Sequence, residues 1–341
     1  MLYRALLWPI SFLYAGVILV RHVLFNIGIL SSSTSNLKAI VIGNIKLGGT
    51  GKTPFTIWLL KKLRAQDTGF LSRGYGRSTK GFLLIESNST PSEVGDEPLE
   101  VSGALPDHPA AVCENRVEGI HELAKQFPSL KQVVLDDAFQ HRRLKPTFSF
   151  VLIDYNDLPI SDSLFPVGGL RDVKSRLKKA HAVVVTKCSS LPSEEQRAAI
   201  RSLLKLSNQQ ILVFTGIRYD TPRPIHADLP AWDSSMKCVA FAGLANPSKF
   251  FHQSQEISRA VVTRKFLDHK SYSSTEAEHL RQDWINFGRE ETRLLTTFKD
   301  AVKCMNNEAF ADLPIYYLPM EMTCLYGEEE LMKAITNVLN H

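Results

Sequence analysis

The sequence predicts an α/β protein whose main domain is a doubly wound parallel sheet built around a phosphate loop. A glycine-rich turn that ends in Lys-Thr lies between a short apolar strand and an amphipathic helix. Short apolar runs that end in polar residues recur along the chain, with helical patterns between several of them. We therefore expect a hydrophobic N-terminal helix at residues 1–30, a core at 31–225 and a second, smaller α/β domain at 226–341.

The N-terminal segment is unusual because residues 5–20 are almost all apolar and carry no charge. The run is slightly short for a membrane span, and Trp8 and Pro9 interrupt it. Arg4 and Arg21 flank it, and basic and aromatic residues around an apolar helix are typical of a membrane interface. A buried core helix is the alternative, and we expect membrane contact.

The phosphate loop is the strongest motif in the chain. A strand at residues 38–44 precedes it and a helix at 54–63 follows it, which is the context of a P-loop NTPase-like fold. Lys46 stands where the longer form of the motif has its first glycine. Glycine lets backbone N–H groups close around phosphate oxygens, and the helix start adds a positive dipole end. We expect the nucleotide phosphates to bind to Gly48, Gly49, Thr50, Gly51, Lys52 and Thr53. We also expect Thr53 to bind Mg²⁺.

Further core strands are expected wherever an apolar run meets polar residues. They are predicted at residues 68–71, 110–113, 132–135, 148–153 and 182–185. Asp136 and Asp137 end one of these strands, as a magnesium-binding carboxylate of a P-loop enzyme does. Residues 186–189 follow another, at the place where a GTPase reads its base. Ser189 supplies no carboxylate for the guanine amino group, so we expect ATP.

The second half of the chain repeats the αβ rhythm after a proline-rich connector at residues 220–235. Strands are expected at 237–244, 261–266, 294–297 and 315–318, and helices at 247–255, 274–287 and 327–339. We assign all of these elements to the smaller domain.

Composition adds mild constraints. The 341 residues are 44% apolar and 22% charged, which is ordinary globular usage. A net charge of +5 is too small to indicate nucleic acid, but it suits an anionic membrane surface or a phosphorylated substrate. The five cysteines form no CxxC pair, which favours reduced thiols in the cytoplasm and argues against a zinc site.

Several polar residues have two open interpretations on their own. Asp96 and Glu97 precede a helical stretch, where acids are also common at helix starts. His269 taken alone is structural rather than catalytic. Arginines beside glycine or at strand ends suit phosphate, although any single one is more often a surface residue; they are Arg73, Arg77, Arg116 and Arg171.

Taken in order, the motifs resemble the tetraacyldisaccharide 4′-kinase family, the lipid A 4′-kinases. The matching segments span nearly the whole chain, and no single one is specific. They are Gly43-Asn44 with residues 48–54 (GGTGKTP), 72–77 (SRGYGR), 95–98 (GDEP), 135–141 (LDDAFQH), 166–172 (PVGGLRD), 241–247 (FAGLANP), 268–269 (DH) and 296–300 (TTFKD). The chain departs from the usual family pattern at Asp172, Leu267 and Phe298.

The resemblance implies transfer of the ATP γ-phosphoryl group to the 4′-hydroxyl of a tetraacyl glucosamine disaccharide 1-phosphate. It implies that Asp96 is the catalytic base with His269 assisting. It also implies that Lys52 and Thr53 serve the phosphates and the metal, and that Arg116 and Arg171 stabilise the transferred charge. The implied magnesium ligands are Thr53, Glu97, Asp136, Asp137 and Asp172. The implied substrate residues are Arg73, Tyr75 and Gln140.

The lipid acceptor gives the apolar N-terminus a purpose, so we expect a monomer at the cytoplasmic face of the inner membrane, without nucleic acid. A membrane-associated P-loop ATPase or GTPase is the alternative; it shares the phosphate loop and metal acids but needs neither Asp96 with His269 nor a lipid acceptor. A soluble small-molecule kinase would leave residues 5–20 unexplained.

Overall fold

The computed structural model describes residues 2–244, 246–267, 270, 272–305 and 307–340. The chain forms two compact units, one from Met1–Ile217 with Met322–His341 and the other from Arg218–Glu321. The last helix, α10 (Glu328–Asn340), therefore belongs to the first unit and not, as the sequence suggested, to the smaller domain. Its buried Leu331 and Ile335 pack in the same core as Ile40 of the central strand, which explains this placement.

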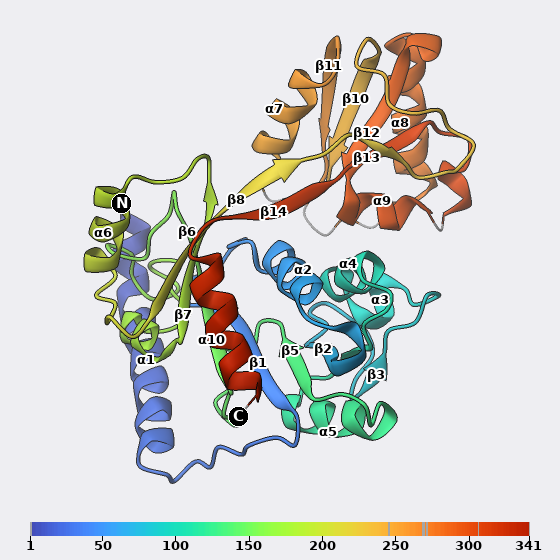
Figure 1. The fold of residues 1–341 in the computed structure, drawn as a ribbon. Helices are drawn as coiled ribbons and strands as arrows, with labels where there is room; N and C mark the ends of the chain where they lie inside the picture. Colours follow the sequence, from blue (N-terminus) through green and yellow to red (C-terminus); the bar gives the residue numbers. More distant parts are fainter. Residues whose placement is uncertain (1, 245, 268–269, 271, 306, 341) are drawn as a thin grey trace. The chain divides into compact units, whose positions relative to one another are not determined.

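The first unit contains a largely parallel sheet (Figure 1). Its strands, in order across the sheet, are β14 (Met320–Tyr326), β8 (Ile211–Tyr219), β7 (Ala182–Cys188), β6 (Phe148–Asp154), β1 (Lys38–Asn44), β5 (Gln132–Leu135), β2 (Thr68–Ser72), β4 (Ala110–Val112) and β3 (Leu83–Leu84). All pairs from β8 to β4 are parallel, and β3 is antiparallel at the edge. The doubly wound prediction is confirmed; β8, β14 and β3 were not foreseen.

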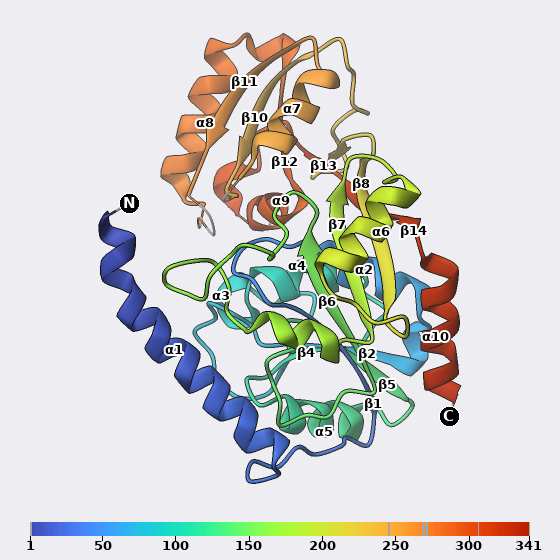
Figure 2. The ribbon, with the colours of Figure 1, turned by 90° about the vertical axis from the view of Figure 1, so that its left-hand side faces the viewer.

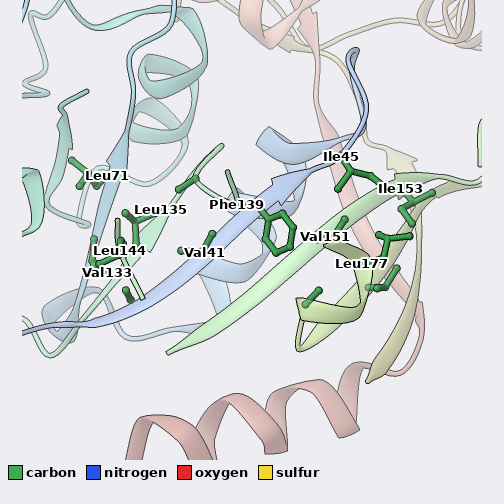
Figure 3. Packing of buried hydrophobic residues seen from close by; sticks show 14 of the residues in the cluster. Val41, Ile45, Leu71, Val133, Leu135, Phe139, Leu144, Val151, Ile153 and Leu177 are labelled. Carbon is green, nitrogen blue, oxygen red and sulfur yellow. The ribbon is translucent and has the colours of Figure 1, made fainter. Parts of the chain in front are cut away.

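Helices cover both faces of this sheet because alternate residues of each buried strand point to opposite sides. Ala39 and Val41 of β1 join the core beneath α5 (Arg116–Gln126) and α6 (Glu194–Leu203), part of which Figure 3 shows. Ile40 and Ile42 join the opposite core, beneath α2 (Lys52–Lys62), α4 (Asp96–Ala104) and α10.

Strand order places the candidate site. The chain adds strands on one side of β1 up to β5, then on the other side from β6 onward, so the winding reverses at β1. Ligands of such sheets bind at this reversal, beyond the carboxyl ends of the strands. The phosphate loop follows β1 directly and Asp136 follows β5, so both lie at that edge.

The smaller unit has its own five-stranded sheet, in the order β11 (Ala260–Lys265), β10 (Lys237–Ala242), β12 (Thr292–Thr297), β13 (Ile315–Leu318) and β9 (Arg223–Pro224). Helices α7 (Ser248–Glu256), α8 (Ser274–Asn286) and α9 (Phe298–Met305) accompany it. Buried Asp300 accepts hydrogen bonds from the Gly243 N–H at 3.0 Å and the Thr297 hydroxyl at 2.9 Å. Two of the sequence motifs thus meet at the ends of β10 and β12 as structural anchors.

The N-terminal helix α1 (Leu2–Asn26) runs along the side of the first unit (Figure 2). Most of its described apolar side chains are exposed, which rules out the buried core helix; Phe25 is a buried exception. The exposed ones include Ile10, Phe12, Leu13, Val17, Leu19, Val20 and Val23. Within the described part of the chain, α1 is the one helix long and apolar enough to cross a membrane. Pro9 lies within it without ending it.

Candidate active site

Two buried side chains fix the phosphate loop. Asn44, the last residue of β1, donates from its amide to the Thr50 hydroxyl at 2.9 Å, and the Thr186 hydroxyl at the end of β7 donates to the Thr50 carbonyl at 2.9 Å. Gly51 caps α2 in the left-handed conformation (φ 78°), which a residue with a Cβ rarely adopts. Lys52 and Thr53 therefore open the helix, where free N–H groups favour an anion.

Lys46, at the position of the missing motif glycine, forms ion pairs with two carboxylates. Its ammonium group lies between the carboxylates of Asp157 and Asp162, 2.7 Å from the latter. Asp162 also accepts from the Gly169 N–H at 3.1 Å. Lys46 thus ties the entrance of the phosphate loop to the segment that carries Arg171, and its side chain does not compete with phosphate at the helix start.

Asp136 is a fully buried carboxylate whose Oδ1 has no hydrogen-bond partner within the described part of the chain. Burial raises the pKa of Asp136 to about 7; the nearby negative charges of Glu97 and Asp137 also raise it, and Lys52 lowers it. A buried carboxylate with an unpartnered oxygen beside a phosphate loop fits a cation, because a bound cation would supply the positive charge that this oxygen lacks.

Asp137 has the opposite electrostatic character. It adopts a left-handed backbone (φ 47°) and forms a two-pronged ion pair with Arg171, one of whose bonds is 3.0 Å. Its Oδ1 is also 3.6 Å from the Lys52 ammonium. Burial would raise the pKa of Asp137, but the Arg171 hydrogen bonds and the charges of Lys52 and Arg171 outweigh burial and lower it to about 2. The two neighbouring acids thus differ in charge near neutral pH.

This difference predicts a pH-dependent stability for the metal-free protein. Between the ordinary aspartate pKa of about 4 and the folded value near 7, folded Asp136 holds a proton that the unfolded chain releases, so Asp136 makes the fold less stable as pH rises through this window. Asp136→Asn, which cannot ionise, should therefore raise Tm relative to the parent by an amount that grows from pH 5 to pH 8. Thermal melting in EDTA measures this, and a difference that stays constant with pH contradicts it.

Arg116 lies against the same strand ends. The guanidinium is buried and donates to the carbonyls of Cys113 at 2.7 Å and Asp136 at 3.3 Å. Burial lowers the pKa of Arg116 to about 10. The negative charges of Asp136 and Asp137 raise this pKa, and the positive charge of Arg73 lowers it, so Arg73 lies close to Arg116. A buried arginine bonded to carbonyls keeps its charge for an anion in the site.

Gln140 and Arg171 meet at one atom. The Gln140 amide donates to the Asn44 carbonyl at 2.7 Å, and Arg171 Nε donates to the same oxygen at 3.2 Å. Two residues more than thirty positions apart in the sequence are thus fixed against the strand that feeds the phosphate loop. Close packing here requires Gly43, because a Cβ at that position would lie 2.5 Å from the Phe139 Cβ.

Asp96 and Glu97 form the first turn of α4, with Gly95 as the helix cap. A Cβ on Gly95 would lie 3.0 Å from the Tyr75 carbonyl, so the loop with Arg73 and Tyr75 packs against this helix start. Glu97 is near enough to Asp136 to raise its pKa. Tyr75 is 80% exposed, as a residue that meets a substrate rather than the core would be.

Asp172 has other contacts. His22 Nε2 lies 2.7 Å from its Oδ1, which also accepts from the Val173 N–H at 2.8 Å. Its carboxylate therefore links α1 to the segment that carries Arg171, and these contacts differ from the metal contact that the resemblance implies.

His269 lies outside the described residues. Among those described, no group of three or more His, Cys, Asp and Glu side chains is arranged to hold a metal ion. Mg²⁺ at phosphate sites takes only one or two carboxylates.

A pocket of about 130 Å³ adjoins the phosphate loop. Its lining includes Gly48, Gly49 and Thr50, as well as Asp154 and Lys187, whose side chains pair at 2.7 Å. Lys187 lies in the segment that the sequence placed beside the nucleotide base. The sequence interpretation gave no role to Lys46, Asp154 or Thr186; a polar residue directly after an apolar strand was the available signal for the last two.

The chain is similar to known proteins in sequence and in fold. The profile of the family described as tetraacyldisaccharide-1-P 4′-kinase matches residues 3–340. The chain is 38% identical to the tetraacyldisaccharide 4′-kinase of Flavobacterium johnsoniae over 98% of its own length and 96% of the relative's. It is 33% identical to that of Bacteroides thetaiotaomicron over 95% and 90%. The crystal structure of "apo" form LpxK from Aquifex aeolicus in complex with ATP is similar with a TM-score of 0.78 and 25% identity, over 99% of this chain and all of that one.

Proposed function

Because this chain belongs to the tetraacyldisaccharide-1-P 4′-kinase family, we propose that it is an ATP-dependent kinase that phosphorylates the 4′-hydroxyl of a tetraacyl glucosamine disaccharide 1-phosphate in lipid A biosynthesis. One observation in the chain itself carries the proposal: Lys52, at the start of the phosphate-loop helix, lies beside the ionised Asp137 and near Asp136, whose Oδ1 has no hydrogen-bond partner among the described residues.

The described residues divide the work by charge. We propose that Lys52 and the amides of residues 48–53 hold the β- and γ-phosphates, and that Arg116 and Arg171 balance charge on the transferred group. Asp136 and Thr53 would hold Mg²⁺, with Glu97 and Asp137 close by, and the ion would neutralise phosphate charge. Arg73, Tyr75 and Gln140 would contact substrate or phosphate.

A sugar hydroxyl is a poor nucleophile at neutral pH, so the reaction benefits from a base. We propose Asp96, at the first turn of α4 next to the Tyr75 loop, as that base, and His269 as its assistant. Asp96 would accept the hydroxyl proton as the oxygen attacks the γ-phosphorus and the bond to the β-phosphate oxygen breaks.

We also propose that the outer face of α1 docks on the membrane that holds the lipid acceptor. Leu13 and Val17 are 71% and 60% exposed, and other large apolar side chains are exposed between Trp8 and Val23. Trp8 is exposed on the same helix, and tryptophan suits the membrane interface. This would place the enzyme at the cytoplasmic face of the inner membrane.

This proposal predicts that Leu13→Glu with Val17→Glu moves the protein from floating to sedimenting fractions when it is mixed with anionic vesicles, because a buried charge is costly in the bilayer interior. Leu203→Glu is the matched control, since Leu203 is 51% exposed on α6, and it should float like the parent. If the double variant floats as well as the parent, α1 does not mediate membrane binding.

Incubation of the purified protein with labelled ATP, Mg²⁺ and the lipid disaccharide 1-phosphate tests the main proposal. We expect a bisphosphorylated lipid. Hydrolysis of nucleotide at the same rate with and without the lipid would instead favour the P-loop ATPase or GTPase.

A further inference from the structure

The inner face of α1, defined here as Ser11, Tyr14, Arg21 and His22, is polar although the helix is apolar overall. These positions recur at helical spacing, so they form one stripe opposite the exposed apolar side chains. A helix that served only as an anchor would need no such stripe. The question is what these side chains hold.

Two of them hold the main chain of the site residues. The Tyr14 hydroxyl donates to the Arg171 carbonyl at 3.0 Å, and Arg21 donates to the Gln140 carbonyl at 2.9 Å. Arg171 and Gln140 are the residues whose side chains converge on the Asn44 carbonyl. Each is therefore fixed from both sides: by α1 through its carbonyl, and by the strand before the phosphate loop through its side chain.

The other contacts set the position of α1 itself. His22 binds the carboxylate of Asp172, next to Arg171, and Ser11 donates to the Leu164 carbonyl at 2.8 Å. Arg142, two residues after Gln140, donates to α1 in turn: to the His22 carbonyl at 3.0 Å and to the Asn26 side chain at 2.9 Å. The helix thus bridges the segment after β5 and the segment before β7.

We infer that Tyr14 and Arg21 are positioning residues, which hold Arg171 and Gln140 in register with the phosphate loop and so make phosphoryl transfer depend on the seating of α1. This inference rests on the proposed function. Arg171 pairs with Asp137 and hence lies next to Lys52, so a small displacement of its main chain would move charge away from the transferred group. The membrane-facing helix would then support the chemistry as well as the location of the enzyme.

Tyr14→Phe and Arg21→Met test this in detergent micelles, where docking on a bilayer plays no part. Each variant removes the donor of one hydrogen bond, so we expect kcat to fall about threefold to tenfold, with the affinity for ATP and the KM for the lipid nearly unchanged. Arg21→Lys keeps a donor and should retain more activity than Arg21→Met. The matched controls are Tyr316→Phe and Arg201→Met, which lose bonds to the Pro230 carbonyl and to the Ser207 and Gln210 carbonyls and should keep the parent kcat.

The outcomes separate the two proposals. If the parent forms product and both α1 variants turn over at the parent rate, the positioning role is wrong and the kinase assignment stands. A rise in lipid KM alone would make Tyr14 and Arg21 substrate contacts and also overturn it. An equal loss of kcat in the control variants would show a general effect of lost stability and would also overturn the positioning role. If the parent forms no product, the proposed function fails and this inference with it.

Discussion

Replacement of Lys52 by alanine is expected to lower kcat by at least about a hundredfold, with the fold intact. Lys52 opens α2 behind Gly51, where the helix dipole already favours phosphate, and its ammonium is 3.6 Å from Asp137. Its removal takes away a cation that would stabilise the negative charge of the phosphates during phosphoryl transfer. Steady-state kinetics with the lipid acceptor measure the loss.

The fold should survive because Arg171 still pairs with Asp137 in this variant. Lys62→Ala is the matched control: Lys62 ends the same helix and pairs with Glu328 at 2.7 Å, away from the site. Circular dichroism should show parent-like spectra for both. Near-normal turnover in Lys52→Ala would sink the assignment of the phosphate loop.

The parts of this molecule that could be predicted are those whose signal is local. Residues 38–44 are apolar and precede glycine, so strand and loop follow from neighbouring residues alone. The same holds for the apolar run that ends at Asp136, and the structure has a strand in each place. Such patterns define which elements exist, and their order predicts the doubly wound sheet.

Contacts between distant segments were beyond reach. Nothing near Asp172 indicates that its carboxylate meets His22, 150 positions away, and a chemically reasonable metal role was the available interpretation. The last helix was misplaced for the same reason, because its amphipathic pattern fits either unit and only the packing of Leu331 under the large sheet decides. A polar residue on an apolar helix was the missed signal for the inner face of α1.

Replacement of Asp96 by asparagine is expected to lower kcat by about a hundredfold or more while stability changes little, because asparagine cannot accept the hydroxyl proton. Gly95 caps α4, so Asp96 contributes to the helix through its charge in the first turn. Loss of that charge costs about 0.3–1 kcal/mol of stability. Glu194→Gln is the matched control, since Glu194 occupies the first turn of α6; it should lose similar stability and keep the parent kcat.

The partner role of His269 is tested by combining the two changes. If His269 only tunes or orients Asp96, His269→Ala lowers kcat by less than Asp96→Asn, and the double variant loses less than the product of the two single losses, since both residues serve one proton transfer. Nucleotide affinity should be unchanged in all three variants because residues 48–53 are untouched. Reduced stability with parent-like kcat in Asp96→Asn would make this residue a helix-start acid and leave the base unidentified. Fully multiplicative losses would separate His269 from the base and assign it an independent task, such as contact with the substrate.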